Sequence, residues 1–527
     1  MQSNFLIKIS FLVLPIVLKT QVQYLVYFKP KDIEKTAYAL SADAMKRKML
    51  YGISLDDKDY AIEPHRKSSI EKIVPVIKSS RWLNAVSVVC TKEELERIKK
   101  LEFVDKVEIL TGIETKLKSS YQKLETNYTI EQYGAAYTQI ELHGGRALHD
   151  EGFEGQGMRI GVFDAGFDRL DKISSFKHLF TENRIFPVKN IVQNSNDVYT
   201  LDGHGTAVMG CMASFLKDTI VASAPKASYY LFITEDPRSE TRVEELNWAV
   251  AAEMADSMGL DIINSSLGYH QFDDPSQNYT RDDMNGKTTI VSKAAAIAVE
   301  KGIVVVNSAG NHGNKDWGII TAPADVEGVI SVGALDINTS LADFSSKGFY
   351  KLNYIKPNIV GVGKGTTLYY DMGNYHFGNG TSFSSPLLAG LIACFWQKNS
   401  FLKPQELRTL LYSTGSNYLS PNLEIGFGLP QFHRPFSFNL IKQKEKNLSV
   451  FPNPSQGNTI LEISSNESIV GAEFEVYFAG KVISKSKVNL LKGVNHIFIN
   501  TDNYAKGLYF FKVKMGNFSL EERYIKN

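Results

Sequence analysis

The segment Arg159-Ile160-Gly161-Val162-Phe163 is short and apolar, and Asp164 follows it directly. A short apolar run without alternation is typical of a strand buried on both faces of a parallel sheet. Four similar runs occur at 229–233, 261–264, 303–306 and 329–332. Helical spacing at 243–258 and 290–301 separates some of these runs, and each helical stretch ends near a glycine. The alternation predicts an α/β fold with a doubly wound, mostly parallel sheet and helices on both faces.

Length and net charge limit the number of domains and the kinds of partner that the chain can have. A chain of 527 residues has room for two to four domains of about 150 residues each. Its net charge of +1 gives no electrostatic reason to expect a nucleic acid or an anionic membrane surface as partner. The three cysteines, Cys90, Cys211 and Cys394, are too scattered for a disulfide framework and are expected to be small buried apolar residues.

The N-terminus has the pattern of a signal peptide. Lys8 precedes an apolar run at 9–18, whose length of about 10 residues suits export and is too short to span a bilayer. We therefore expect residues 1–22 to be a signal peptide, with a buried first strand as the alternative. Residues 23–527 contain no stretch that predicts a transmembrane helix.

Two flanking regions differ from the central one. Residues 24–113 predict a small α/β unit with strands at 24–28, 83–90 and 104–110 and helical spacing at 68–78. Thr91 and Glu94 form a capping-box pattern that predicts a helix at 92–100. After residue 445, strand-like runs at 459–463, 473–478, 496–499 and 508–513 alternate with turn residues and predict a β-sandwich.

Three chemistry-bearing residues stand in the central region. Asp164 ends its strand, His204 lies in Asp202-Gly203-His204-Gly205-Thr206, and Ser382 lies in Gly380-Thr381-Ser382-Phe383-Ser384-Ser385-Pro386. A serine hydroxyl becomes a nucleophile when an imidazole takes its proton and a carboxylate orients the imidazole. Taken singly, these residues also fit a turn aspartate, a capping or core histidine and an N-cap serine. Their order, Asp then His then Ser, is the one found in subtilisins.

Residues 150–436 resemble the catalytic domain of subtilisin-family serine proteases. Beyond the triad, the resemblance includes Asn264-Ser265-Ser266-Leu267-Gly268, Ser308-Ala309-Gly310-Asn311-His312-Gly313 and Gly426-Phe427-Gly428-Leu429-Pro430. It implies that Ser382 is the nucleophile, His204 the general base and Asp164 the residue that orients it. It also implies an oxyanion hole made by Asn311 and the backbone N–H of Ser382. The residues implied to bind substrate are Ser265, Ser266, Leu267, Gly268, Ser308, Ala309 and Gly310.

The sequence departs from the family at several positions. Phe383 and Ser384 stand where Met and Ala are usual, and His312 is unusual beside the oxyanion asparagine. Thr321 aligns with a position that lines the primary specificity pocket, for which we expect medium size and a preference for apolar or small side chains. The resemblance implies no required cofactor. Family members often bind structural calcium, but no acidic loop in the sequence is specific enough to assign, and no metal ligand is predicted.

The resemblance extends to the flanking regions and gives the expected domains. Residues 23–115 resemble an inhibitor-like propeptide, 128–436 form the catalytic domain, and 445–527 resemble a type IX secretion sorting domain, most specifically at Val450-Phe451-Pro452-Asn453-Pro454-Ser455. An accessory α/β domain that stays attached is the alternative for the first region. A carbohydrate-binding or adhesion domain is the alternative for the last.

The sequence thus predicts an exported serine endopeptidase made as a self-processing zymogen, secreted or held at the cell surface. Its expected partners are protein or peptide substrates, its own propeptide and the type IX secretion machinery. The alternative is a catalytically silent surface binding protein on the same fold. An α/β-hydrolase esterase would need a Gly-x-Ser-x-Gly motif and the residue order Ser, Asp, His, and a metallohydrolase would need His-Glu-x-x-His. The sequence contains neither pattern around its chemistry-bearing residues.

Overall fold

The computed structural model describes residues 22–110, 133–216, 218–369, 375–432, 448–451, 459–465, 469–490, 493–516 and 518–526. It divides into two compact units, residues 1–433 and 434–527, and each is described separately. The expected signal peptide lies almost wholly outside the described residues. Within them, no helix is both long and apolar enough to cross a membrane.

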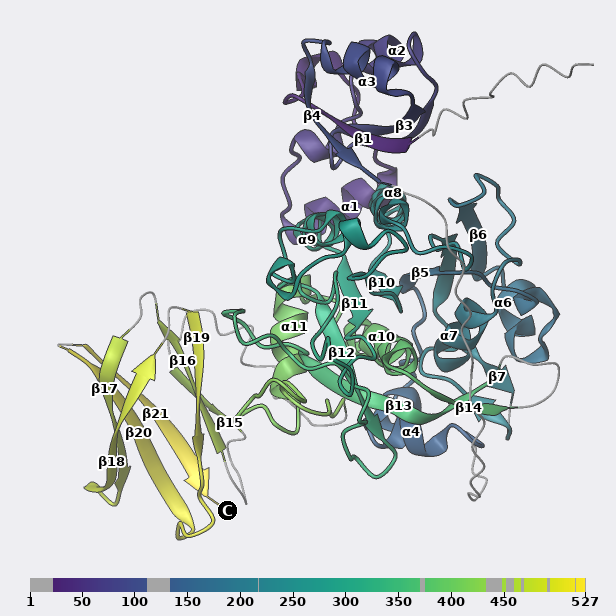
Figure 1. Cartoon of the computed structure of the whole chain (residues 1–527). Coiled ribbons are helices and arrows are strands. Elements are labelled where there is room, and N and C mark those ends of the chain that lie inside the picture. Colours follow the sequence, from purple (N-terminus) through teal and green to yellow (C-terminus); the bar gives the residue numbers. More distant parts are fainter. Residues whose placement is uncertain are drawn as a thin grey trace, which may run out of the picture. The chain divides into compact units, whose positions relative to one another are not determined.

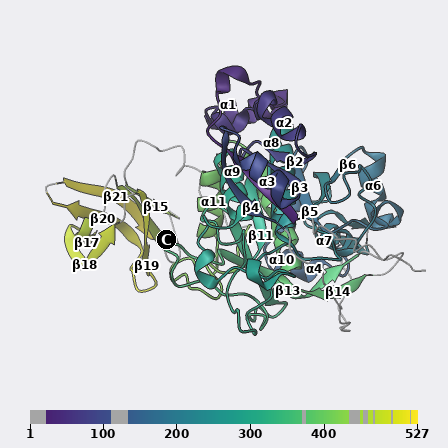
Figure 2. The same ribbon diagram turned by 45° about the horizontal axis from the view of Figure 1, so that its top comes forward.

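The N-terminal part of the first unit, residues 22–110, is a four-stranded antiparallel sheet covered by helices (Figure 1). Its strands, in the order β2-β3-β1-β4, are β1 (Val22–Phe28), β2 (Val76–Ser80), β3 (Ala85–Cys90) and β4 (Val104–Ile109). Helices α2 (Pro64–Glu71) and α3 (Lys92–Lys99) lie on its outer face, which Figure 2 turns toward the viewer. The expected helix at 68–78 is wrong in its second half, because 76–80 form a strand that pairs with β3.

Strand β1 is buried on both sides. Tyr24 and Val26 pack against the helices of the outer face, whereas Leu25 and Tyr27 pack against the central region of the chain. The predicted capping box is confirmed: the Thr91 N–H donates to Glu94 at 2.8 Å and the Glu94 N–H to Thr91 at 3.3 Å. Three elements of this region have no sequence pattern that predicted them: a helix, α1 (Ala42–Tyr51), and two short 3-10 turns, η1 (Ile33–Lys35) and η2 (Asp57–Asp59).

The central region contains an eight-stranded sheet in the order β14-β13-β12-β11-β10-β5-β9-β6. The strands are β5 (Arg159–Asp164), β6 (Ile185–Asn190), β9 (Ser228–Ile233), β10 (Ile262–Ser265), β11 (Val304–Ser308), β12 (Ile330–Asp336), β13 (Ile359–Leu368) and β14 (His376–Asn379). All neighbours pair in parallel except β13 and β14. A small hairpin, β7 (Phe215–Leu216) and β8 (Ile220–Val221), stands apart. The predicted parallel strands are confirmed.

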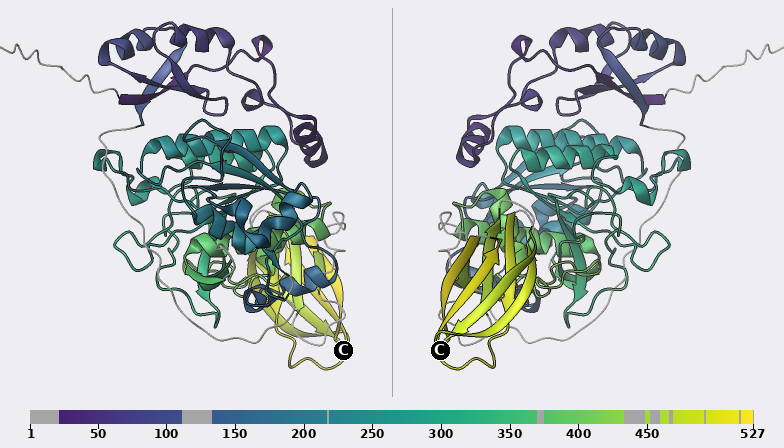
Figure 3. Two further views of the ribbon diagram at one scale, coloured as in Figure 1. Left: turned by 90° about the vertical axis from the view of Figure 1, so that its right-hand side faces the viewer. Right: turned by 90° about the vertical axis from the view of Figure 1, so that its left-hand side faces the viewer.

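Helices cover both faces of this sheet (Figure 3). They are α4 (Tyr137–Glu141), α5 (Gly145–Asp150), α6 (Lys177–Thr181), α7 (His204–Ala213), α8 (Arg242–Met258), α9 (Ile290–Glu300), α10 (Thr381–Lys398) and α11 (Pro404–Ser413). Helices α8 and α9 share a core with Phe163, Ile263 and Val305 on one face. Helix α10, which is buried almost throughout, packs against the sheet together with α7. The three cysteines are free and buried, as expected.

The second unit is built from two antiparallel sheets, β15-β16-β19 and β18-β17-β20-β21. Their strands are β15 (Leu448–Phe451), β16 (Thr459–Ser465), β17 (Ile469–Phe478), β18 (Lys481–Leu490), β19 (Gly493–Ile499), β20 (Gly507–Met515) and β21 (Phe518–Lys526). One core takes side chains from both sheets, such as Leu461 and Ile463 from one and Phe511 and Val513 from the other. The predicted sandwich agrees with this arrangement. Part of the sorting motif, residues 452–455, lies outside the described residues.

Candidate active site

Asp164 ends β5 at the carboxyl edge of the parallel sheet, where functional side chains gather in such folds. Its side chain is fully buried. One carboxylate oxygen, Oδ1, accepts the N–H of Ala165 at 2.9 Å and lies 2.7 Å from Nδ1 of His204. A buried carboxylate at this distance fixes the tautomer of the imidazole, with the proton on Nδ1 and the lone pair on Nε2.

His204 is the first residue of α7. Gly205 lets this helix start approach the loop that follows β5, because a Cβ there would lie 2.4 Å from the carbonyl oxygen of Gly166. Burial of the ring opposes protonation, but the charge and hydrogen bond of Asp164, helped by Asp202, outweigh it and raise the pKa of His204 above its ordinary value. The backbone N–H of His204 donates to Asp202 at 2.7 Å. The histidine is therefore a stronger base than a free imidazole.

Ser382 lies in the first turn of α10, where the helix dipole favours negative charge. Its hydroxyl donates to the carbonyl of Ser266 at 3.4 Å, and the Ser266 hydroxyl donates to the carbonyl of Ser382 at 2.9 Å. Among the described residues, no hydrogen bond joins the Ser382 hydroxyl to His204. The Phe383 ring is buried, with its centroid 6.0 Å from that of His204.

Asn311 is held by Thr381, a residue that the sequence analysis did not single out. The Thr381 N–H and hydroxyl both donate to Oδ1 of Asn311, at 2.9 and 3.0 Å. The same hydroxyl accepts the N–H of Gly310 at 3.2 Å. Because both hydrogen bonds from Thr381 go to Oδ1, the amide nitrogen of Asn311 points away from Thr381. It lies 3.6 Å from where a Cβ on Gly380 would be, beside the backbone that precedes Ser382.

Two segments predicted to bind substrate follow neighbouring parallel strands, β10 and β11. Ser265 and Ser266 are buried, Leu267 is half-buried and Gly268 is exposed. Ser308 and Ala309 are buried, and the amide of Asn307 joins the two segments by donating to the Leu267 carbonyl at 3.0 Å. The structure thus brings all the predicted site residues to one edge of the sheet.

Thr321 fills the space between these two segments. A Cβ on Gly268 would lie 2.1 Å from the Thr321 hydroxyl oxygen, and a Cβ on Gly310 would lie 3.2 Å from it. The residue is fully buried, and its hydroxyl has no hydrogen-bond partner among the described residues. Thr321 thus lies against the glycines of both segments, and the pocket size expected from the sequence stays a prediction.

An aromatic and histidine cluster lies next to this gap. The His270 ring centroid is 4.5 Å from that of His312 and 4.4 Å from that of Trp317. Burial lowers the pKa of both histidines to about 4, so both rings are neutral at pH 7. His270 and Trp317 also line an open cavity of about 340 Å³. No sequence motif predicted this cluster, because its members come from separate loops.

Two buried glutamates and one half-buried glutamate form an acidic group. Carboxylate oxygens of Glu235, Glu240 and Glu244 come within 4.8 Å of one another. Glu235 accepts hydrogen bonds from Tyr269 and Thr234, and Glu244 caps the start of α8. Burial raises the pKa of Glu235 to about 7. Two of the three carboxylates thus have structural partners, and we assign no metal to the group.

The doubly wound sheet brings an aspartate, a histidine, a serine and an asparagine to its carboxyl edge. This arrangement defines the class of the subtilisin-like serine hydrolases. The Subtilase family matches residues 155–428, more than half of the chain, and the chain belongs to this family. It is a serine endopeptidase of the subtilisin type.

The chain is also similar to several curated subtilisins. The chain is 32% identical to Subtilisin DY of Bacillus licheniformis over 287 residues, which cover 53% of this chain and 90% of the relative. It is 27% identical to Subtilisin E of Bacillus subtilis (strain 168) over 400 residues, which cover 75% of this chain and 91% of the relative. It is 29% identical to Subtilisin Savinase of Lederbergia lenta over 286 residues, which cover 54% of this chain and 92% of the relative.

Both flanking regions match known domains. Residues 23–126 match the peptidase S8 propeptide domain of Bacteroidota, and residues 449–527 match the secretion system C-terminal sorting domain. These matches confirm that the flanking regions are a propeptide domain and a sorting domain. The sorting domain indicates export by type IX secretion, to the cell surface or the medium. The domain limits expected from the sequence, 23–115, 128–436 and 445–527, stay predictions.

Proposed function

We propose that this exported protease hydrolyses peptide bonds with Ser382 as nucleophile, His204 as general base and Asp164 as the orienting carboxylate. The observation that carries the proposal is the 2.7 Å contact between the buried Asp164 and Nδ1 of His204. With Nδ1 as donor, Nε2 can take the proton of Ser382. The Ser382 hydroxyl must first rotate away from the Ser266 carbonyl, a single change of side-chain rotamer.

The covalent steps follow from these roles. The Ser382 oxygen adds to the carbonyl carbon of the substrate while its proton passes to His204. His204 then gives that proton to the leaving amine, and the C–N bond breaks to leave an ester on Ser382. Water, deprotonated by His204, cleaves the ester and releases the second product. The Asn311 amide and the Ser382 N–H are proposed to donate to the oxygen that becomes negative.

The pH dependence of activity should report the raised pKa of His204. The base must be neutral, so activity is present above its pKa and is lost as pH falls through it. We expect the acidic limb of kcat/KM to have its midpoint above the ordinary histidine value of about 6.5. Asp202→Asn removes one of the charges that favour the imidazolium, so it should move the limb to lower pH. If Asp202→Asn leaves the midpoint of the acidic limb unchanged, the proposed effect of Asp202 on the pKa of His204 is wrong.

Thr321 is proposed to select small side chains at the substrate residue whose carbonyl is attacked (P1). A large P1 side chain would collide with Thr321 between Gly268 and Gly310. We expect the wild type to favour alanine or serine at P1. Thr321→Gly should raise kcat/KM for phenylalanine or leucine at P1 by about tenfold or more. Thr321→Ser, which keeps the hydroxyl, is the matched control, and a wild type that prefers phenylalanine would overturn the assignment.

A fluorophosphonate probe tests the proposed function directly. It reacts with a serine that a working base activates, so it should label the mature protein once, on the peptide that contains Ser382. A protein that resists the probe and does not cleave casein would favour the alternative, a silent surface binding protein. No cofactor enters the proposed reaction, and structural calcium stays unassigned.

We also propose that the protein is made as a zymogen that cleaves itself after the N-terminal domain. The support is the match of residues 23–126 to a peptidase S8 propeptide domain and the packing of that domain on α8 and α9. The N-terminal sequence of the mature enzyme would locate the cut.

A further inference from the structure

Two histidines meet beside the candidate active site, one from each segment predicted to bind substrate. His270 comes two residues after Gly268, in the segment that follows β10, and His312 comes directly after Asn311, in the segment that follows β11. Their ring centroids are 4.5 Å apart, and the ring planes are inclined by 68°. The contact therefore joins the two loops on which the proposed reaction depends.

Neither of these imidazoles has a structural partner of the usual kind. His143, His149 and His178 each have a ring nitrogen within hydrogen-bond distance of a backbone carbonyl, which explains why those histidines are buried. By contrast, the rings of His270 and His312 form no hydrogen bond with another described residue. Both rings are half-buried, so part of their hydration is lost without compensation. Their nitrogen atoms are therefore available to a ligand.

The backbone beneath both rings is fixed. Tyr269, the neighbour of His270, exchanges two backbone hydrogen bonds with Ala322, at 2.9 and 3.3 Å. The N–H of His312 donates to the Ser346 hydroxyl at 3.0 Å. Groups that are already held in place lose little freedom when they bind a ligand. The histidine pair is in this sense prepared for binding.

Solvent reaches the pair through the open cavity of about 340 Å³ that His270 and Trp317 line. The Trp317 ring lies 4.4 Å from the His270 ring, centroid to centroid, and is itself held by a hydrogen bond from its Nε1 to the Ile320 carbonyl at 3.3 Å. Trp317 thus limits how far the His270 ring can move away from His312. The cavity gives a small ion a path to both rings.

Paired imidazoles of this kind are typical ligands of zinc and similar transition-metal ions. An ordinary histidine is mostly neutral at pH 7, and the neutral ring is the commonest metal ligand in proteins. Zinc binds imidazole nitrogen at about 2.0–2.1 Å, so two ligands of a tetrahedral ion have nitrogens about 3.3 Å apart. Rotation of the side chains can bring rings with centroids 4.5 Å apart to this separation. Calcium and magnesium prefer oxygen ligands and do not fit.

We propose that His270 and His312 bind a zinc ion and that the bound ion lowers the activity of the protease. The effect on activity rests on the proposed function. The Cδ2 atom of His312 would lie 3.4 Å from a Cβ on Gly310, and the Thr321 hydroxyl would lie 3.2 Å from the same atom. An ion on His312 is therefore close to the place proposed for the P1 side chain. It also restrains the loop that carries Asn311.

The charge of Lys315 opposes the ion. The Lys315 N–H donates to the His312 carbonyl at 2.9 Å, and the positive side chain acts on both histidine rings. Replacing Lys315 by methionine keeps the length of the side chain and removes its charge. We expect Lys315→Met to tighten zinc binding by about a few-fold. An unchanged affinity would place the ion away from this pair.

The main test measures binding without catalysis. The full chain carrying Ser382→Ala is freed of metal with a chelator and titrated with zinc chloride in a calorimeter. Removal of a partner that only orients a metal ligand costs about ten- to a hundredfold in affinity, so His270→Gln and His312→Gln should each weaken binding by at least about tenfold. His65→Gln is the matched control, because His65 is exposed and lies on α2 of the N-terminal domain.

Zinc affinity that survives in both variants, or that falls equally in His65→Gln, would overturn the site. Because the two histidines lie on separate loops, either variant can test the site if the other does not fold. Since Ser382 is absent from these titrations, their failure does not bear on the catalytic proposal, and a failed fluorophosphonate reaction does not bear on zinc binding.

The second measurement concerns activity. Zinc should inhibit peptide cleavage by the active wild type, and a chelator should restore it. His270→Gln and His312→Gln should resist zinc, each compared with its own activity in zinc-free buffer. Inhibition that stays equally strong in both variants would mean that the ion acts elsewhere, as on His204, and the proposed regulation would be wrong.

Discussion

Replacing Ser382 by alanine is expected to lower kcat for a peptide substrate by about a millionfold, the size of loss known for the catalytic serine of subtilisin itself. The reason is that, in the proposed mechanism, Ser382 is the group that forms the ester with the substrate. Binding should survive, because the segments after β10 and β11 are unchanged, so KM should move little. The same variant should accumulate as the full-length chain with its N-terminal domain attached. Active-site titration and the mature N-terminal sequence measure the two effects.

Ser384→Ala is the matched control for this prediction. It removes a hydroxyl two residues further along α10, one that donates to the carbonyl of Thr381 at 3.2 Å and takes no part in the proposed reaction. Its activity should stay within a few-fold of the wild type. Normal maturation and casein hydrolysis by Ser382→Ala would show that Ser382 is not the nucleophile.

Asn311→Ala is expected to lower kcat by about a hundred- to a thousandfold with little change in KM, as is known for the corresponding asparagine of subtilisin. In the proposed mechanism, the amide that Thr381 orients donates to the oxygen on which charge develops, and that charge exists only in the transition state. Losing such a donor leaves substrate binding intact and raises the barrier. Steady-state kinetics on one peptide give both constants.

Asn314→Ala is the control for Asn311. It removes an exposed amide from the same loop, one that donates to Asp343 at 3.3 Å. It should leave kcat unchanged. A rise in KM with unchanged kcat in Asn311→Ala would mean that the amide binds substrate in the ground state, and the oxyanion assignment would be wrong. Thr381→Val, which removes the hydroxyl that holds Asn311, should show a smaller loss in the same direction.

Local patterns were enough to predict the central fold. The runs 160–163 in β5 and 304–306 in β11 are apolar throughout because both faces of the sheet are covered, and such runs can be recognised without tertiary information. The candidate site left sequence patterns for a related reason. Its predicted catalytic residues lie on a strand end and at helix starts, next to glycines that let other chain segments approach, and such positions leave short, recognisable motifs.

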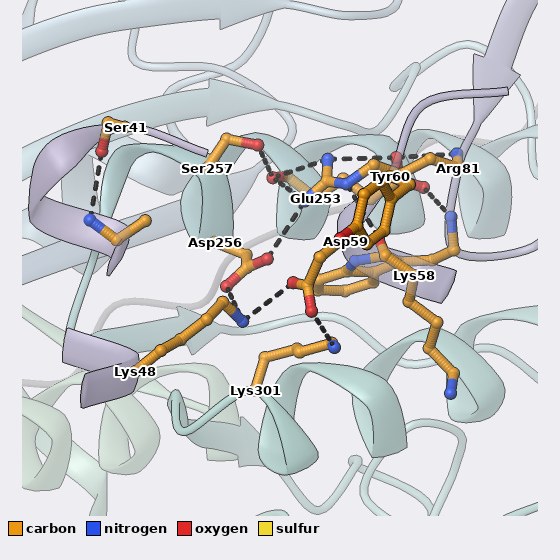
Figure 4. Close-up of polar contacts among 12 residues, drawn as sticks. Ser41, Lys48, Lys58, Asp59, Tyr60, Arg81, Glu253, Asp256, Ser257 and Lys301 are labelled. Atoms are coloured by element: carbon orange, nitrogen blue, oxygen red, sulfur yellow. Dashed lines mark hydrogen bonds and ion pairs between the residues drawn. The ribbon is translucent and has the colours of Figure 1, made fainter. Parts of the chain in front are cut away.

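Features that depend on distant partners were not predictable. Arg47 and Lys48 are residue types usually found at the surface, and their burial depends on distant partners: Asp256 for both, and Asp59 for Lys48 (Figure 4). Residues 76–78 continue a helical spacing but belong to a strand because β3 supplies the partner. Thr381 and Thr321 carry no motif of their own. Their roles depend on which loops the fold brings beside Asn311 and Gly268.

The double burial of β1 has a consequence for how activation of the proposed zymogen would end. On departure of the N-terminal domain, Leu25, Tyr27, Ala85 and Leu110 would lose their cover together and become an apolar patch on a small domain. A domain of this size that has lost one face of its core is prone to unfold, and an unfolded chain is a good protease substrate. In the proposed zymogen, departure would therefore be irreversible, because no folded N-terminal domain would be left to rebind.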